Sequence, residues 1–227
     1  MKQYVIIVAG GKGVRMGTTI PKQFLEIKGK AIILHTLEKF KEALPSVELL
    51  LVLPKGEMSR WHDLSVGTEF EKIKLANGGS TRFESVKAGL DLIESDGIVG
   101  VHDAVRPFVS TNTIQKVFSE ASNSEAAIPV VELKDSIRKI VDGSSVAADR
   151  SDFRIVQTPQ CFNVRLLKEA YQQPFNKIFT DDASVVEAKG VAIKLVEGNY
   201  SNIKITTVED LKIGELLMEN GSLKSKS

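Results

Sequence analysis

Short apolar runs that alternate with helical patterns constrain this chain more than any other feature. Residues 4–8 form a continuous apolar run, mostly β-branched and followed closely by glycines, which is typical of a strand buried on both faces of a parallel sheet. Similar runs cover residues 48–53, 98–102, 126–131 and 191–196. Each is predicted to be a strand of one central sheet.

Helical periodicity fills the intervals between these runs. Apolar residues return every three or four positions in residues 32–40, 82–93, 113–121, 164–171, 182–189 and 208–219. Strands alternating with helices predict an α/β fold, with a Rossmann-like, mostly parallel sheet and helices on both faces. Ligands of such folds bind outside the carboxyl ends of the strands, so the loops there are the first candidates for a site.

A polar segment at about residues 132–155 interrupts the alternation. Its short-period pattern and the dipeptide Asp142-Gly143 predict a β-hairpin arm that projects from the domain. Residues 1–220 are expected to form a single domain that includes this arm. The small, polar residues 221–227 are expected to be a disordered tail.

Composition excludes several classes of partner and site. A net charge of +1 over 227 residues provides no broad field for nucleic acid or an anionic membrane, so any anion site must be local. No apolar run approaches the roughly 18 residues needed to span a bilayer. Cys161 is the lone cysteine and the histidines are scattered, so no zinc-site spacing is present. We therefore expect a soluble, cytoplasmic protein.

The segment VAGGKGVRMGTTIPKQF, residues 8–24, places a glycine turn directly after the first expected strand. It departs from the dinucleotide fingerprint because Met16 replaces the third glycine, and from the P-loop because a glycine follows Lys12. What remains is a turn whose backbone N–H groups can surround an anion, with Arg15 and Lys22 supplying positive charge. A tight turn with solvated lysines is the alternative that the loop alone leaves open.

The pattern Ala-Gly-Gly-x-Gly-x-Arg-Met followed by Pro-Lys-Gln resembles the signature of sugar and polyol phosphate nucleotidylyltransferases. Seven further blocks, in order, resemble the 2-C-methyl-D-erythritol 4-phosphate cytidylyltransferase family: GGSTRFESV, VHDAVRPF, DSIRK, AADR, QTPQCF, TDDASVVE and NIKITTVEDL. The resemblance implies a nucleotide-diphospho-sugar transferase fold. It also implies transfer of a cytidylyl group from CTP to methylerythritol phosphate in non-mevalonate isoprenoid biosynthesis. Val8, Gly10 and Ser80 differ from residues that many members carry near the base.

Matched positions imply roles for individual residues. Arg15, Lys22 and Lys204 match catalytic cations, and Mg²⁺ is expected to arrive with CTP, with no protein ligand named. Residues implied near the nucleotide are Ala9, Gly10, Gly11, Gly13, Gly79, Ser80 and Ser85. Alternatives remain: Ser80 or Thr81 can simply cap a helix, and Lys204, which we place at a strand end, can be the solvent face of an edge strand.

The acceptor side is implied by residues from several blocks. These are Asp103, Arg106, Ser136, Arg150 and Thr180. In the family the arm pairs two subunits, so a homodimer is expected in which Arg150 reaches the partner's site. Asp103 with Arg106 is alternatively a local salt bridge, and Thr180 alternatively a helix cap.

His102 is expected to be a hydrogen-bonded core residue, and Thr158 is a weaker site candidate. A relative that activates ribitol 5-phosphate shares AGGKGxRMG, HDAVRPF and NIKITT, so the acceptor is open between the two polyol phosphates. A non-catalytic nucleotide sensor on the same fold is the third reading, against which the three cations argue.

Overall fold

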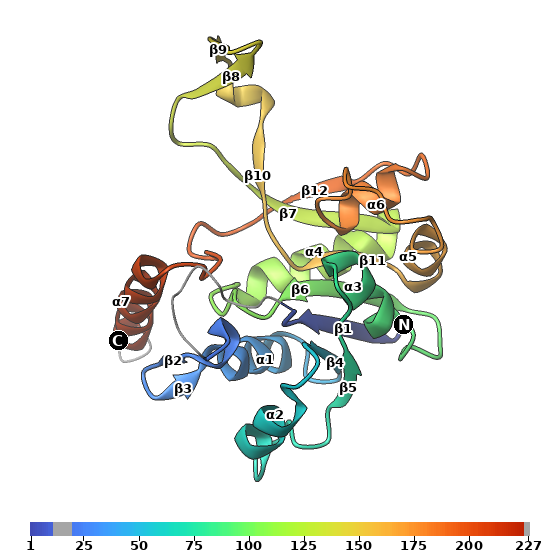
Figure 1. Ribbon diagram of the computed structural model, residues 1–227, viewed down its shortest axis with the longest axis vertical. Helices are drawn as coiled ribbons and strands as arrows, with labels where there is room; N and C mark the ends of the chain where they lie inside the picture. The colour runs from blue at the N-terminus through green and yellow to red at the C-terminus, as the bar shows by residue number, and fades with distance from the viewer. Residues whose placement is uncertain (11–19, 225–227) are drawn as a thin grey trace.

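The structure is a computed structural model that describes residues 1–10 and 20–224, with side chains as far as residue 219. An eight-stranded sheet forms its centre (Figure 1), in the order β10-β7-β11-β6-β1-β4-β5, with β12 paired to β7. The strands are β1 (Gln3–Val8), β4 (Glu48–Leu53), β5 (Lys74–Asn77), β6 (Ile98–Asp103), β7 (Ala126–Glu132), β10 (Arg154–Val156), β11 (Gln160–Asn163) and β12 (Lys194–Glu197).

The sheet is mixed but mostly parallel, which confirms the predicted class. β1 runs parallel to β4 and β6, β4 to β5, and β7 to β12. β10 and β11 are antiparallel to their neighbours and were not predicted. β12 begins at Lys194 rather than at residue 191.

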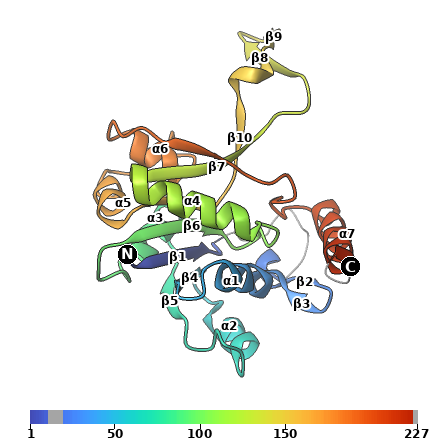
Figure 2. The ribbon, with the colours of Figure 1, turned by 180° about the vertical axis from the view of Figure 1, so that it is seen from behind.

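Helices cover both faces of the sheet, as Figures 1 and 2 show from opposite sides. They are α1 (Ile32–Ala43), α2 (Met58–Ser65), α3 (Arg82–Leu90), α4 (Thr111–Ser124), α5 (Val164–Ala170), α6 (Asp182–Glu187) and α7 (Val208–Lys224). Alternate residues of β1 point to opposite layers. Val5 and Ile7 join the core under α1 and α4, whereas Ile6 and Val8 join the core under α3, α5 and α6. A strand that is covered on both faces has to be apolar throughout, which explains its continuous run.

The predicted arm is a separate two-stranded sheet of β8 (Ile137–Val141) and β9 (Ser144–Ala148), which projects well away from the main sheet (Figure 1). Asp142 and Gly143 have φ angles of 48° and 78°. Positive φ at both central residues is the type I′ geometry that matches the twist of a hairpin. The arm leaves the sheet at the end of β7 and returns through β10.

The last helix begins with a capping box and extends farther than expected. Asp210 accepts hydrogen bonds from the backbone N–H groups of Thr206 and Thr207, while the Thr207 hydroxyl accepts one from the backbone N–H of Asp210. α7 then continues to Lys224, so residues 221–224, which we expected to belong to a disordered tail, are helical. Helix propagation adds one bond for each residue fixed, and the glycine at 221 costs only about 1 kcal/mol relative to alanine.

Among the helices of the described chain, none combines the length and the apolar character that crossing a membrane requires.

Candidate active site

A cleft of about 270 Å³ opens at the carboxyl ends of β1 and β6. It lies where a parallel sheet presents its ligand groups. Eight residues expected from the sequence line it: Ala9, Gly10, Lys22, Gly79, Ser80, Ser85, Asp103 and Lys204. They come from four separate parts of the chain.

One wall of the cleft is built by close backbone packing around Ser85. The Ser85 hydroxyl donates to the Thr81 carbonyl at 2.9 Å. A β-carbon added to Gly10 would lie 3.3 Å from this hydroxyl oxygen, and one added to Gly78 would lie 3.0 Å from it. The missing side chains of Gly10 and Gly78 therefore leave room for the Ser85 hydroxyl, and Gly10 remains exposed at the cleft.

The neighbouring turn is fixed by the cap of α3. Thr81 and Glu84 form a reciprocal capping box, and the Glu84 carboxylate also accepts from the backbone N–H and the hydroxyl of Ser80. A β-carbon on Gly79 would lie 2.2 Å from Glu84 Cβ, so the box requires glycine there. The capping alternative for Thr81 is thus confirmed. It holds Ser80 at the cleft wall.

Lys22 is held at the cleft by its neighbour in the Pro-Lys-Gln segment. Residues Lys22–Phe24 form a short 3₁₀ helix, η2, in which Gln23 is almost fully buried. The Gln23 amide donates to the carbonyl of Ala9 at 2.9 Å. This bond ties η2 to the end of β1 and holds Lys22 at the cleft that Ala9 and Gly10 also line.

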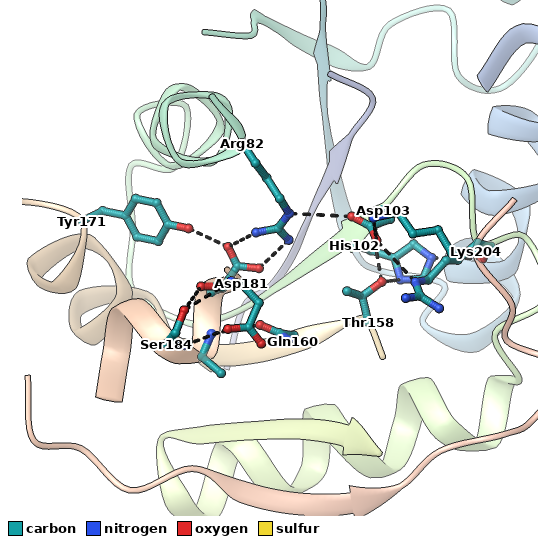
Figure 3. A network of polar contacts seen from close by, with 12 residues as sticks. Arg82, His102, Asp103, Thr158, Gln160, Tyr171, Asp181, Ser184 and Lys204 are labelled. Atoms are coloured by element: carbon teal, nitrogen blue, oxygen red, sulfur yellow. Dashed lines mark hydrogen bonds and ion pairs between the residues drawn. The ribbon is translucent and has the colours of Figure 1, made fainter. Parts of the chain in front are cut away.

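Asp103, at the end of β6, is the centre of a cluster of charges (Figure 3). Lys204 Nζ lies 3.0 Å and Arg106 Nε 3.3 Å from Asp103 Oδ2, while Arg82 Nε lies 3.7 Å from Oδ1. Burial by itself would raise the pKa of the Asp103 carboxyl, but the charges of Arg82, Lys204 and Arg106 outweigh it and hold that pKa well below its usual range. Asp103 is therefore a carboxylate that holds several cations at one edge of the cleft.

Lys204 is positioned by its buried neighbours rather than by a strand. Residues 202–206 do not form a strand, so the expectation that Lys204 lies at a strand end was wrong. Asn202 is fully buried and donates to the Thr158 carbonyl at 2.9 Å. Ile205 is fully buried, and its N–H donates to the Val105 carbonyl at 2.9 Å. With both sides anchored, the Lys204 side chain extends toward Asp103.

Arg106 contributes to this anchoring and is not part of the lining of the cleft. Its Nη1 donates to the Asn202 carbonyl at 2.8 Å, in addition to its contact with Asp103. Two of its nitrogens thus hold the Lys204 segment against the end of β6. In this structure Arg106 lies next to the cleft.

His102 is the buried core residue that was expected, and its bonds define its tautomer. Nε2 lies 3.1 Å from the Arg106 carbonyl, an acceptor, so Nε2 carries the proton. Nδ1 of the neutral ring then accepts from the Thr158 hydroxyl at 3.0 Å. Burial is the main reason why the pKa of His102 is lowered to about 4. Thr158 also accepts from the backbone N–H of Asp103, which fixes the end of β6.

Comparison with known proteins decides the family. The family model described as IspD, 2-C-methyl-D-erythritol 4-phosphate cytidylyltransferase, matches residues 3–220. The chain belongs to this family.

Individual relatives agree over nearly the full length. The 2-C-methyl-D-erythritol 4-phosphate cytidylyltransferase of Bacteroides thetaiotaomicron is 51% identical over 219 residues, which cover 96% of this chain and 100% of the relative. That of Bacteroides fragilis is 48% identical over the same shares. The crystal structure of the Thermus thermophilus enzyme of this name superposes with a TM-score of 0.77 at 33% identity, covering 96% of this chain and 98% of that one. The family and the fold expected from the sequence are confirmed.

Several residues matched to the family motifs do not line the cleft, or lie outside the described chain. Ser136 and Arg150 are exposed on the arm side, where an Arg150 nitrogen donates to the Lys134 carbonyl. Thr180 lies just before α6, and Asp181, not Thr180, caps that helix. Arg15, Gly11 and Gly13 lie outside the described residues.

Arg82 and Gln23 line the cleft and were not predicted. Arg82 occupies the first turn of a helix, where the macrodipole disfavours a cation. The presence of Arg82 at the start of the helix in GGSTRFESV was therefore the one signal that a contact outside the helix holds this residue. Gln23 gave no such signal beyond its place in Pro-Lys-Gln.

Proposed function

We propose that the chain transfers the cytidylyl group of CTP to 2-C-methyl-D-erythritol 4-phosphate. The products are pyrophosphate and 4-diphosphocytidyl-2-C-methyl-D-erythritol, a step of non-mevalonate isoprenoid biosynthesis. The observation that carries the proposal is the family match over residues 3–220, joined to a cleft that gathers Lys22, Arg82 and Lys204 from distant parts of the chain.

The chemistry requires positioned positive charge more than any other group. An oxygen of the acceptor phosphate attacks the α-phosphorus, so a new P–O bond forms as the bond between the α-phosphorus and the β-phosphate oxygen breaks. A phosphate monoester is already ionised near neutral pH, so no base has to remove its proton. The protein must hold two anions in line and stabilise the charge that develops in the transition state. We assign this work to Lys22 and Lys204, with Arg15 from the glycine loop.

The nucleotide is assigned to the wall that carries the glycines. Gly10 and Gly79 are exposed at this wall, and the buried Ala9 lines it beside Gly10. Ser80 and Ser85 lie on the same wall, and the glycine loop with Gly11 and Gly13 continues it in sequence. Small residues allow a planar base to approach the backbone closely.

Magnesium fits this site as an ion carried by the triphosphate. Among the described residues no three histidine, cysteine, aspartate or glutamate side chains gather into a metal-binding group. Asp103 is the one carboxylate among the described residues that line the cleft, and it would be the protein group available to the ion or to its water ligands. A bound Mg²⁺ neutralises phosphate charge and is otherwise hydrated. Its remaining ligands would be phosphate oxygens.

The acceptor is assigned to the opposite edge, near Asp103, Arg106 and Thr180. We further propose that the protein is a homodimer in which the arm of one subunit brings Ser136 and Arg150 to the acceptor phosphate in the site of its partner. The distance of the arm from its own sheet supports this arrangement (Figure 2). A cytoplasmic location, where CTP is made, is part of the same proposal, and the single, fully buried thiol of Cys161 agrees with it.

The decisive experiment measures pyrophosphate release from purified protein with Mg²⁺. CTP, UTP, ATP and GTP are each paired with 2-C-methyl-D-erythritol 4-phosphate and with ribitol 5-phosphate. Turnover is expected only with CTP and the methylerythritol acceptor. Turnover with ribitol 5-phosphate alone would assign the chain to the other acceptor. Tight CTP binding without turnover in any of these combinations would make it a nucleotide sensor.

A further inference from the structure

Arg82 connects three elements at the wall of the cleft (Figure 3). It is the first residue of α3 and follows the Gly79-Ser80-Thr81 turn. Its Nη1 and Nη2 donate to the two oxygens of Asp182 at 2.8 Å and 2.7 Å, and its Nε faces Asp103 at 3.7 Å. One guanidinium therefore joins the nucleotide wall, the end of β6 and the start of α6.

The Asp182 side of this pair is fully buried, whereas the Arg82 side chain is 30% exposed. The Asp182 side chain is 0% exposed, and the Tyr171 hydroxyl donates to its Oδ1 at 2.6 Å. Burial opposes the charged form of Arg82, but the Asp182 carboxylate outweighs this effect and raises the pKa of the guanidinium. Leaving either charge without its partner would be costly, so the two side chains hold one another in place.

A second contact holds the same segment from the next residue of α3. The Phe83 ring stacks on the Tyr171 ring at 4.5 Å and lies 5.9 Å from that of Phe179. From β11, the Gln160 amide donates to Asp181 at 2.8 Å and accepts from the Ala183 N–H at 2.9 Å. Segment 171–183 is thus fixed to the first turn of α3 by charge and by aromatic packing.

Stability alone does not account for this arrangement. A buried ion pair contributes little relative to apolar residues of similar volume. The Thr81–Glu84 box already caps α3, and a cation at a helix N-terminus is unfavourable. What the pair does provide is a fixed position of residues 180–182 relative to Asp103, across the edge of the cleft to which the acceptor is assigned.

We propose that Arg82 is a positioning residue for the acceptor, which acts through Asp182 to set Thr180 and Asp181 against Asp103. Tyr171 in turn orients the Asp182 carboxylate. This inference rests on the proposed function, in which the edge near Asp103 and Thr180 receives the acceptor phosphate. It predicts that weakening the Arg82–Asp182 pair impairs the use of the acceptor far more than the binding of CTP.

The test compares Arg82→Lys with a matched control. Lysine keeps the charge and loses the two-pronged bond. Because a displacement of about 1 Å can cost about 10²-fold, the KM for methylerythritol phosphate is expected to rise by about 10- to 100-fold. The Kd for CTP, measured by calorimetry without acceptor, is expected to change by less than about threefold. Arg165→Lys is the control, because Arg165 makes an exposed two-pronged bond to Asp96 far from the cleft, and it should leave both constants unchanged.

Tyr171→Phe keeps the ion pair and removes one hydrogen bond, so it should raise the KM for the acceptor in the same direction by a smaller factor. Equal changes in the two constants, or a folded Arg82→Lys variant with wild-type values, would overturn the positioning role. If circular dichroism shows that Arg82→Lys does not fold, the Tyr171→Phe result decides in the same way. Failure of the wild-type protein to release pyrophosphate would instead reject the proposed function.

Discussion

Replacing Lys204 with methionine should lower kcat strongly while it leaves the free energy of unfolding almost unchanged. The Lys204 side chain is 41% exposed, and its ammonium lies 3.0 Å from Asp103 at the cleft. Asp103 keeps Arg82 and Arg106 when Lys204 is removed, so no buried carboxylate loses all its partners. Methionine preserves most of the length of the side chain, so the change in the free energy of unfolding should stay below about 1 kcal/mol.

The kinetic effect should be much larger. A unit charge about 4 Å from a phosphate oxygen interacts by about 4 kcal/mol at an effective dielectric of 20. Partial exposure and the neighbouring Asp103 carboxylate reduce this value, which leaves about 3 kcal/mol of transition-state stabilisation, or about 10²-fold in kcat.

The assay is steady-state pyrophosphate release with saturating CTP and methylerythritol phosphate, paired with thermal unfolding of the same sample. Lys30→Met is the matched control, because Lys30 is 42% exposed and pairs with Glu38 at 2.8 Å on the protein surface. The control should retain wild-type kcat. A Lys204→Met protein with kcat within about threefold of wild type would refute the catalytic role of this cation.

Three further predictions concern stability, packing and assembly. Because burial lowers the pKa of His102 to about 4, the unfolded state takes up its proton first as the pH falls. The free energy of unfolding should therefore fall by about 2 kcal/mol between pH 7 and pH 5. His102→Gln should remove that part of the pH dependence, as measured by urea titrations. Gly79→Ala would place its β-carbon against Glu84, so it should cost about 1–2 kcal/mol in thermal unfolding and weaken CTP binding; an unchanged melting temperature would contradict the packing described. Arg150→Ala should lower kcat/KM for the acceptor by about 10²-fold. Mixing it with Lys204→Met should restore about a quarter of wild-type turnover through mixed dimers, and no restoration would exclude a site shared between subunits.

The strongly patterned elements could be predicted from the sequence. β1, β4 and β6 are buried on both faces, so each contains a continuous apolar run that is unlike a loop. The hairpin followed from Asp142-Gly143, since few other residue pairs accept positive φ at both positions. β11 could not be recognised, because its four residues are both polar and apolar and pair in the antiparallel direction.

In the site, too, residues that belong to short motifs could be predicted, whereas contacts between residues distant in sequence could not. The positions of Lys22, Gly79 and Asp103 at the cleft follow from motifs that each occupy a few consecutive residues. The bond between Arg82 and Asp182 joins residues 100 positions apart. The sequence around either residue does not predict the other as its partner. Likewise the Lys204 segment resembles a strand by its alternation, yet it is fixed by Asn202 and Ile205 outside any sheet.

The most direct test of the central claim is a crystal structure of the protein with CTP and Mg²⁺ bound. Cations from distant parts of the chain should converge on one nucleotide, so the ammonium groups of Lys22 and Lys204 are predicted to lie within about 4 Å of the triphosphate oxygens, with the base against Gly79 and Ser85. A triphosphate bound elsewhere, with both lysines directed into solvent, would contradict the account.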